Sequence, residues 1–571
     1  MSNTIRIIST SDVHGKVLPH SYADGRELNC GFVKLAALVD ELRTENTILI
    51  DNGDTLDGSP LQSFYYAQQR SMKNDGHDAE KDGSGRSSAM ESDFDESPVS
   101  KAMALMKYDY INVGNHDFDY GSEELRKHIE KTGAKCINLN LGFDYDVREI
   151  AGYRIAFFGV LTHFTTRWES EEKLAGAEFP DAFLLAKETV ERIKDEVSPD
   201  YIVCCYHGGL ERSPETGEVA ACEDGENQGY RMLTEIDGID VLIMGHQHTL
   251  SAGVYFSGDV NTAEVGEAQG RYPGRRTAYL QPGVDGSYVS VIDLEAGTGK
   301  MEARLVPLDI SFSGGVEASK SSVDAVMHTV SKASVDAVIP TVSRAIVDAV
   351  MPMEEACQRW LDMPIGRSKI DLLVHDEERE RLDKPQFITF INKVQMERMD
   401  ADIAASSLFK GATGLGPVIT MRDLVSSYAF PNTLVKKRIT GRVLKEYIEK
   451  TLEFWQATDG KIEVSLEYLK PIEQHFNYDI FDGIEYEAEI SRPRGGRLTK
   501  LTRGGRSIND DDEFTIVLNN YRASGGGNYP MLAKLETIGE DLTNMVDVLA
   551  EYIRGCGEID FEPVYNVRIR V

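Results

Sequence analysis

The feature that most constrains the fold is a pattern that occurs five times in the first half of the chain. A short run rich in β-branched and aromatic residues leads directly into glycine accompanied by aspartate, asparagine or histidine. The five segments are TIRIISTSDVHG, TILIDNGDTLDGSP, YDYINVGNHDFDYG, DYIVCCYHGG and DVLIMGHQH. Each run predicts a β-strand, and helix-like stretches at 31–43 and 183–196 lie between some of them. This alternation predicts a layered α/β domain.

Polar side chains follow all five predicted strands. In a layered α/β domain the carboxyl ends of neighbouring strands meet at one edge, where such sheets bind ligands. Five of the twelve histidines of the chain lie in these segments. We therefore expect one shared site. Its candidate residues are Asp12, His14, Asp54, Asn115, His116, His207, His246 and His248.

The composition of this set is typical of a binuclear metal centre. Asp12 and His14 are two residues apart, as are His246 and His248, so each pair can face one ion from an extended segment. A carboxylate such as Asp54 can bridge two divalent ions about 3.5–4 Å apart. Imidazole and carboxylate ligands together favour Zn, Mn, Fe or Co over Ca. The pattern predicts two divalent metal ions and hydrolysis at phosphorus.

Length and charge limit the remaining possibilities. A chain of 571 residues is expected to form two domains. Its formal net charge of −33 argues against a nucleic-acid polymer or an anionic membrane surface as the main partner. The sequence contains neither an apolar run of transmembrane length nor a signal-peptide pattern after Met1. We expect a cytoplasmic protein; a secreted or cell-surface protein whose signal has been removed is the alternative.

The seven cysteines fit a reducing compartment, in which we expect them to be core thiols. Cys204 and Cys205 are adjacent within one predicted strand and are poorly placed to bridge each other. No pattern in the sequence indicates an oligomeric state.

The five motifs, in order, spacing and local sequence, resemble the calcineurin-like metallophosphoesterases over about residues 5–310. The likeness is to the branch containing 5′-nucleotidases and 2′,3′-cyclic-nucleotide phosphodiesterases. The resemblance implies an N-terminal α/β/β/α sandwich at 1–312 and a C-terminal 5′-nucleotidase-type α/β domain at 363–571. It also implies how the metals are shared: one on Asp12, His14 and His248, the other on Asn115, His207 and His246, with Asp54 bridging. Several relatives carry Gln or Asn in place of His248, which keeps a ligand and can change the metal preference.

His116 and Asp119 are the candidate catalytic pair. They lie three residues apart, close enough for the carboxylate to hold the imidazole. In the resembling family this dyad stabilises the transition state or protonates the leaving oxygen, and a partner carboxylate favours the acid role by raising the pKa of histidine. Asn115, next to His116, is counted with the catalytic set as well as with the ligands. The alternative for His116 is a further metal ligand, and Asp117 is expected to be a structural turn residue.

Two segments are predicted to lie outside the chemistry. Residues 71–98 are polar and rich in glycine and serine, which predicts a disordered insertion. Residues 313–362 form the predicted interdomain connector, in which a 12-residue repeat starts at Ser322, Ser334 and Ile346. Three short copies are too few for a repeat domain. We expect Pro340 and Pro352 to break or kink any helix there.

The resemblance continues into the second half of the chain. TMRDLVSSYAFPNTL and LNNYRASGGGNYP are similar to the nucleotide-recognition domain of the same branch. There the base is held between two aromatic rings, which by position are Phe430 and Tyr521, with Asn432 as a further substrate-binding residue. Stacking of a base on a ring typically contributes ~1–3 kcal/mol.

Two departures from the family pattern concern the substrate, a small-molecule nucleotide. Strict 5′-nucleotidases carry an arginine where this chain reads SSLFKGATGLG, and an aspartate that contacts the ribose hydroxyls where this chain has Gly527. Both differences favour a 2′,3′-cyclic-nucleotide 2′-phosphodiesterase/3′-nucleotidase. The alternatives are a 5′-nucleotidase or UDP-sugar hydrolase and, in another class, a catalytically silent nucleotide-binding sensor.

Overall fold

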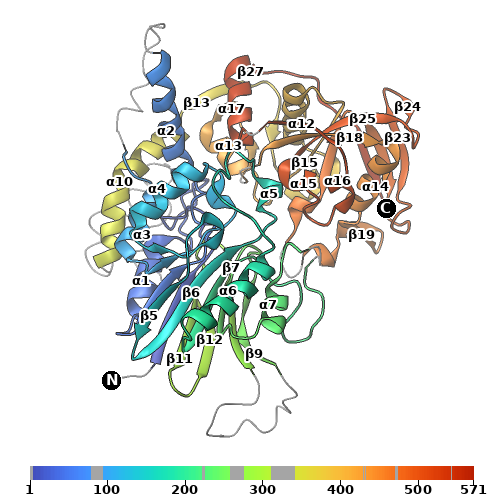
Figure 1. The fold of residues 1–571 in the computed structure, drawn as a ribbon. Coiled ribbons are helices and arrows are strands. Elements are labelled where there is room, and N and C mark those ends of the chain that lie inside the picture. Colours follow the sequence, from blue (N-terminus) through green and yellow to red (C-terminus); the bar gives the residue numbers. More distant parts are fainter. Residues whose placement is uncertain are drawn as a thin grey trace. The chain divides into compact units, whose positions relative to one another are not determined.

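The computed structural model divides into two compact units, an N-terminal unit of Met1–Gln358 and a C-terminal unit of Arg359–Val571 (Figure 1). Each unit is described by itself. The structure describes residues 4–78, 94–221, 225–257, 275–309, 341–428, 430, 432–469, 473–541 and 543–571.

Two six-stranded sheets form the centre of the N-terminal unit. The first has the order β12-β11-β1-β2-β3-β4, in which β1 to β4 are parallel and β11 and β12 are antiparallel additions. Its strands are β1 (Thr4–Thr10), β2 (Thr47–Asp51), β3 (Tyr110–Ile111), β4 (Lys135–Cys136), β11 (Tyr288–Glu295) and β12 (Lys300–Pro307).

The second sheet has the order β5-β6-β7-β8-β10-β9, with β6, β7, β8 and β10 parallel. Its strands are β5 (Asp146–Ile150), β6 (Tyr153–Leu161), β7 (Tyr201–His207), β8 (Val241–Met244), β9 (Leu250–Ser257) and β10 (Arg275–Pro282). The five predicted strands are therefore β1, β2, β3, β7 and β8, and the sequence pattern divides between two sheets.

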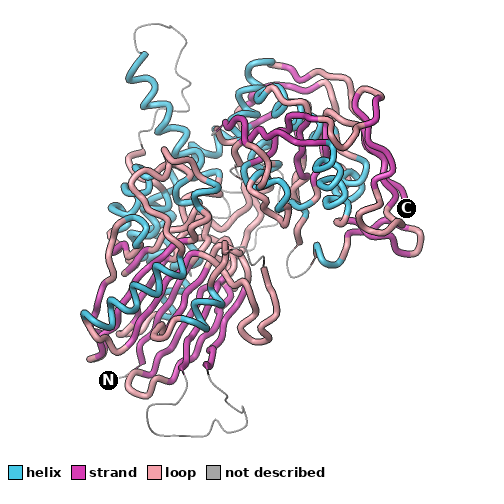
Figure 2. Tube along the Cα trace, turned by 45° about the vertical axis from the view of Figure 1, so that its right-hand side comes forward, coloured by secondary structure: helices cyan, strands magenta, loops and turns pink. Residues whose placement is uncertain are grey.

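The two sheets pack face to face and are covered by helices on their outer faces. Apolar side chains of β1, β2 and β11 meet those of β6, β7 and β10 in one buried cluster. A second cluster joins the other face of β6–β8 to α6 (Ala182–Glu196) and α7 (Gly229–Glu235). The parallel connections of the first sheet run through α1 (Phe32–Leu42), α3 (Pro98–Met106) and α4 (Ser122–Thr132), on the side away from α6 (Figures 1 and 2). The expected α/β/β/α sandwich is confirmed.

The predicted disordered insertion is wrong at its beginning. Helix α2 runs from Pro60 to Asp78 and thus includes the first eight residues of the 71–98 segment. Once a helix has formed, each further residue adds one backbone hydrogen bond, and no proline interrupts this stretch. Residues 79–93 lie outside the described part of the chain, and 94–98 lead into α3.

Pro352 was expected to break or kink any helix, and the break does not occur. Helix α10 (Thr341–Leu361) continues through Pro352 and crosses the division between the units. One face of it is buried, including Ile346, Val350 and Ala356. We infer that this burial offsets the hydrogen bond that proline cannot make. The first copy of the repeat, and the second copy up to Pro340, lie outside the described residues, whereas the last five residues of the second copy belong to α10.

The C-terminal unit is built around a five-stranded sheet of order β21-β15-β25-β18-β26. These strands are β15 (Ile403–Ser407), β18 (Leu434–Thr440), β21 (Asp479–Asp482), β25 (Glu513–Asn519) and β26 (Thr537–Asp541). A four-stranded sheet of order β24-β23-β22-β28 is formed by Arg506–Ser507, Leu498–Arg503, Glu485–Glu489 and Val567–Arg570. The main helices are α12 (Gln386–Met399), α13 (Met421–Ser427), α14 (Gly441–Leu452), α15 (Asn520–Ala523) and α17 (Met545–Cys556).

Six of the seven cysteines are described, and all six are free thiols. Five are buried as expected, whereas Cys556 at the end of α17 is exposed, because the helix turns its last residues away from the core. Among the described residues, no helix combines the length and the apolar character needed to cross a membrane.

Candidate metal centre

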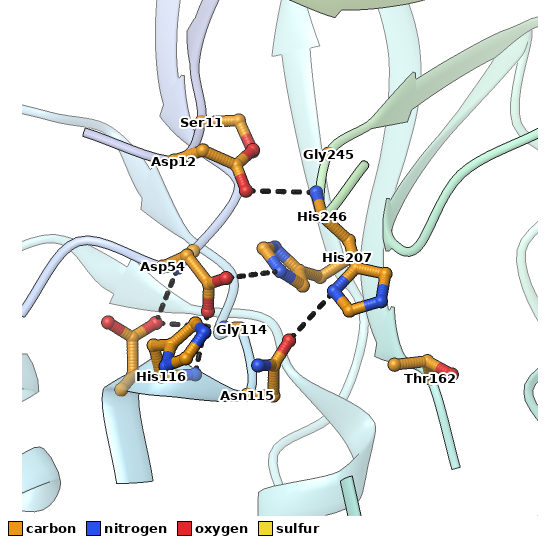
Figure 3. Close-up of polar contacts among 12 residues, drawn as sticks. Ser11, Asp12, Asp54, Gly114, Asn115, His116, Thr162, His207, Gly245 and His246 are labelled. Carbon is orange, nitrogen blue, oxygen red and sulfur yellow. Dashed lines mark hydrogen bonds and ion pairs between the residues drawn. The ribbon is translucent and has the colours of Figure 1, made fainter. Parts of the chain in front are cut away.

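The carboxyl ends of five parallel strands bring the predicted ligands to one edge of the sandwich (Figure 3). β1, β2 and β3 of the first sheet supply Asp12, His14, Asp54 and Asn115. β7 and β8 of the second sheet supply His207, His246 and His248. The shared site expected from the sequence thus lies where the ends of the two sheets meet.

Much of the ligand set is held by strained backbone. Left-handed φ angles are uncommon for residues other than glycine and cost about 1–3 kcal/mol each. Such strain persists only where the surroundings enforce it. Here the amide of Asp12 donates to Gly53 O (2.9 Å) and that of His14 to Asp54 O (3.0 Å). The strained candidates are Asp12 (φ 55°), His14 (50°), Asp54 (54°), His246 (71°) and His248 (57°).

The first ligand group consists of Asp12, His14, Asp54 and His248, whose donor atoms all lie within 4.8 Å of one another. His14 Nδ1 lies 3.1 Å from the carbonyl of Asp57 and can only donate to it, so Nε2 is free to bind a cation. His14 Nε2 and His248 Nε2 face each other at 3.0 Å. Asp12 Oδ1 is 3.5 Å from His248 Nε2.

The second group consists of Asp54, His207 and His246, so Asp54 belongs to both. His207 Nδ1 donates to Asn52 O (2.8 Å), which leaves Nε2 directed at Asp54 Oδ2, 3.1 Å away. Both of these atoms are buried and lack hydrogen-bonding geometry. Burial acts to lower the pKa of His207, but the charge of Asp54 outweighs it and raises the pKa to about 9. A cation between His207 Nε2 and Asp54 Oδ2, either a proton or a metal ion, would therefore be stabilised.

His246 shows the same excess of acceptor atoms. Its Nε2 lies 2.9 Å from a carboxylate oxygen of Glu226. Its Nδ1 lies 2.9 Å from Asn115 Oδ1 (Figure 3). A neutral imidazole carries only one N–H, so it cannot donate to both oxygens. If Nε2–H donates to Glu226, Nδ1 and Asn115 Oδ1 are both free to coordinate. The donor set of both groups therefore fits divalent cations.

Glu226 is a site residue that the sequence did not reveal. It lies between the fourth and fifth motifs, and no run of β-branched residues leads into it in the sequence, so the pattern of strand ends could not identify it. A carboxylate on the second nitrogen of a ligand histidine fixes its tautomer and ring orientation. The His246 ring is also stacked on Trp168, at 5.2 Å between centroids.

Asp117 and Gly114 shape the loop that carries Asn115. Asp117 accepts four backbone N–H bonds of 2.8–2.9 Å, from Gly114, Asp54, Thr55 and Leu56. It is therefore a structural turn residue, as expected. A Cβ at Gly114 would overlap Asp54 Oδ1, so only glycine allows this close approach.

The two residues of the predicted dyad are in contact with each other beside the candidate metal ligands. His116 Nδ1 lies 3.0 Å from Asp119 Oδ2, and the His116 ring is 5.5 Å from the ring of His14. The amide of His116 donates to Asp54 Oδ1 (2.8 Å). Burial acts to lower the pKa of His116, but the carboxylates of Asp119 and Asp54 raise it well above its usual value. His116 can thus carry a proton at neutral pH, with Nε2 directed away from Asp119.

The predicted substrate residues of the C-terminal unit lie in loops and at a helix start. Phe430 is 44% exposed and packs edge-on against Phe409 (4.8 Å). Tyr521, in the short helix α15, is 38% exposed, and its ring centroid lies 6.2 Å from that of Phe476. The side chain of Asn432 donates to the hydroxyl of Tyr428 (3.3 Å). Both rings are accessible, and their role in binding stays a prediction.

Comparison with known families assigns both units. Residues 5–250 match the calcineurin-like phosphoesterase family, and residues 364–534 match the 5′-nucleotidase C-terminal domain. The chain therefore belongs to the calcineurin-like phosphoesterases that carry a 5′-nucleotidase C-terminal domain, and these are hydrolases of phosphoric esters that use divalent metals.

The curated relatives have more than one specificity. The chain is 24% identical to the 2′,3′-cyclic-nucleotide 2′-phosphodiesterase/3′-nucleotidase of Salmonella typhimurium, over 91% of this chain and 81% of that protein. It is 22% identical to the 5′-nucleotidase of Vibrio cholerae, over 97% of this chain and 91% of that protein. It is 23% identical to the trifunctional nucleotide phosphoesterase of Bacillus subtilis over 96% of this chain, which spans only 38% of that protein.

Solved structures support the fold. A Staphylococcus aureus protein solved with α-ketoglutarate aligns with a TM-score of 0.76 at 26% identity, over 99% of both chains. The Thermus thermophilus 5′-nucleotidase precursor aligns with a TM-score of 0.55 at 16% identity, also over 99% of both chains.

Proposed function

We propose that the protein is a two-metal 2′,3′-cyclic-nucleotide 2′-phosphodiesterase/3′-nucleotidase. The observation that carries the hydrolase half of this proposal is the pair of ligand groups that share Asp54 next to His116. One ion would be held by Asp12, His14 and His248, and the other by Asn115, His207 and His246, with Asp54 between them. The divalent ions, Mn, Zn, Fe or Co, would supply Lewis-acid activation of water and charge stabilisation at phosphorus.

The residues of the chain have distinct tasks in this reaction. Asp54 stays ionised: burial acts to raise its pKa, but His207 and the other histidines lower it well below the usual value. His116 donates a proton from Nε2 to the leaving oxygen, while Asp119 holds Nδ1–H and keeps the ring oriented. The raised pKa of His116 keeps that proton available at neutral pH.

Packing around Gly527 supports the cyclic and 3′ specificity. This residue has φ +73°, and a Cβ there would overlap Asn477 Oδ1 and Arg522 Nη1. Arg522 cannot easily move, because it is buried and paired with Asp479 at 2.6 Å. The loop therefore has no room for the aspartate that contacts ribose hydroxyls in the 5′ type. A ribose with its 2′ and 3′ oxygens in a cyclic phosphate presents no hydroxyl pair.

The base would stack between Phe430 and Tyr521, with Asn432 beside them. Their exposure leaves both rings accessible for stacking. The Salmonella typhimurium relative is named a 2′,3′-cyclic-nucleotide 2′-phosphodiesterase/3′-nucleotidase, which agrees with the proposed specificity. The Vibrio cholerae relative is named a 5′-nucleotidase, which agrees with the alternative function, a 5′-nucleotidase or UDP-sugar hydrolase.

A substrate panel on metal-loaded protein tests the proposal. We expect kcat/KM to be higher for 2′,3′-cyclic AMP and 3′-AMP than for 5′-AMP and UDP-glucose, with a phosphatase added to reveal opening of the cyclic ester. A preference for 5′-AMP would contradict the specificity and leave the metal site intact. No turnover of any phosphoester would favour the nucleotide-binding sensor.

A further inference from the structure

A second aromatic ring, Phe409, packs against the predicted stacking ring Phe430. Phe409 lies in the segment SSLFKGATGLG, where this chain lacks the arginine of strict 5′-nucleotidases. The two ring centroids are 4.8 Å apart and the ring planes are inclined at 71°, which is an edge-to-face arrangement. Phe409 is only 7% exposed, whereas Phe430 is 44% exposed. A buried ring therefore supports a ring at the surface.

Tyr428 extends this contact along the loop that carries Phe430. Phe409 also packs edge-on against Tyr428, with 5.2 Å between the ring centroids and 78° between the planes. Tyr428 is 3% exposed, and its hydroxyl accepts a hydrogen bond from the side chain of Asn432 at 3.3 Å. Phe409 thus contacts two residues of this loop and is linked to a third, which the proposed function places beside the base.

Hydrogen bonds hold the backbone on both sides of Phe409. The buried Arg381 donates to Leu408 O from Nε (3.4 Å) and from Nη2 (3.0 Å). Glu377 forms an ion pair with Arg381 at 2.5 Å and accepts a hydrogen bond from the amide of Gly411 at 3.0 Å. Both side chains come from one helix, four residues apart. The backbone that carries the buried ring is therefore fixed independently of the ring itself.

Ser427 connects the same segment to the start of the Phe430 loop. Its hydroxyl donates to Gly414 O at 2.9 Å and lies 3.3 Å from the hydroxyl of Thr413. Ser427 is 1% exposed and immediately precedes Tyr428. A half-exposed ring without support would lose rotamer freedom when it stacks on a ligand, and a ring that is ordered before binding avoids this cost.

We propose that Phe409 is a positioning residue that holds the Phe430 ring in the orientation required for stacking on the base of the nucleotide. The inference rests on the proposed stacking role of Phe430. Loss of the Phe409 ring would remove the edge-to-face contact and allow the Phe430 ring to turn. Binding of the nucleotide would then weaken, whereas the chemical step at the metal centre would keep its rate.

The first test is the kinetics of Phe409→Leu, which keeps apolar bulk at this position and removes the ring. We expect KM for 2′,3′-cyclic AMP to rise about threefold, within the range that an aromatic pair contributes, and kcat to stay at the level of the parent protein. The internal reference is KM for bis(p-nitrophenyl) phosphate, a phosphodiester without a base. A KM for 2′,3′-cyclic AMP equal to that of the parent would overturn the proposal.

The matched control is Phe390→Leu in the same unit. Phe390 is fully buried, and its ring packs against Tyr552 at 5.9 Å between centroids. This change should lower the thermal transition temperature, because it also removes a buried ring, and it should leave KM for 2′,3′-cyclic AMP unchanged. An equal rise of KM in Phe390→Leu and Phe409→Leu would show a general effect of lost packing and would overturn the positioning role.

A double-mutant cycle tests whether Phe409 acts through Phe430. In the Phe430→Ala background, Phe409→Leu should raise KM for 2′,3′-cyclic AMP no further, because the ring that it positions is gone. Independent increases that multiply would overturn the inference. If Phe430→Ala alone raised KM while Phe409→Leu did not, stacking would stand and only the positioning role would fail. A KM unchanged in Phe430→Ala would refute the proposed stacking role and this inference with it.

Calorimetric titration with adenosine gives a readout that does not depend on turnover. Adenosine has a base and a ribose but no phosphate, so its binding to metal-loaded protein reports on the base site. We expect Kd for adenosine to rise in Phe409→Leu by about the same factor as KM, and to stay at the parent value in Phe390→Leu. A parent-like Kd in Phe409→Leu would contradict the proposal.

Discussion

The two units hold their predicted functional side chains in different ways. In the N-terminal unit the ligand candidates lie close together at the ends of two sheets, several of them on strained backbone. In the C-terminal unit Phe430 and Tyr521 are exposed on separate loops and helix starts, and the rigid part lies beneath them in the buried Arg522–Asp479 pair. A metal centre needs each donor atom in place, whereas a stacking site needs only an accessible face backed by a firm support.

Asp54→Asn should have the largest effect. Asparagine tolerates the left-handed backbone of this position, so the change removes the charge with little added strain. Loss of the carboxylate shared by both groups should lower kcat/KM by about 10³-fold, since metal ions supply several kcal/mol of transition-state stabilisation. The bound metal per chain, measured by plasma mass spectrometry, should fall below that of the parent protein. The exposed Asp24→Asn serves as the control, and unchanged metal content in Asp54→Asn would contradict the bridging role.

His116→Ala should have the next largest effect. Removing a positioned general acid typically costs about 10²-fold or more in kcat. The bound metal should stay at the level of the parent protein, because the donor atoms of both groups come from other residues. Metal analysis beside steady-state kinetics checks both points. Loss of metal would make His116 a ligand, and an unchanged kcat would exclude the dyad from the reaction.

The grouping of these candidate ligands could be predicted from the sequence because metal chemistry restricts the residue types. Only a few side chains bind divalent cations, and five short strands ending in such residues point to one place. Figure 3 shows that Asp12, Asp54, His207 and His246 indeed meet there. The N-terminal sandwich followed from the same strands, with the division into two sheets supplied by the family resemblance.

Residues that support the site could not be predicted in this way. No run of β-branched residues leads into Glu226 in the sequence, and carboxylates at such positions are usually solvated. Only the fold shows that Glu226 contacts His246. Pro352 shows the converse limit, since a local rule predicted a break or a kink, and the helix continues through the proline with one face of α10 buried.

Gly527→Ala should test the firm support beneath the C-terminal rings. The new methyl group meets Asn477 and Arg522, and overpacking costs about 1–3 kcal/mol. Gly504→Ala is the matched control, because Gly504 also has a positive φ (+55°) but open space around its Cβ position. We expect calorimetry to show a clearly lower transition temperature for Gly527→Ala than for Gly504→Ala. Equal shifts would mean that the loop adapts, and that Gly527 does not exclude a side chain.

Phe430→Ala should have the smallest effect. It should distinguish most clearly between binding of the base by the C-terminal unit and hydrolysis at the N-terminal metal centre. Loss of one stacked ring is expected to raise KM for 2′,3′-cyclic AMP about tenfold, within the ~1–3 kcal/mol that stacking contributes per base. The kinetics of bis(p-nitrophenyl) phosphate should not change, because this ester has no base to stack and its hydrolysis needs only the metal centre. The exposed Leu466→Ala change in the same unit is the control for a general loss of apolar surface. Equal losses on both esters would show that Phe430 supports the fold, and the base would then have to be recognised elsewhere in the C-terminal unit.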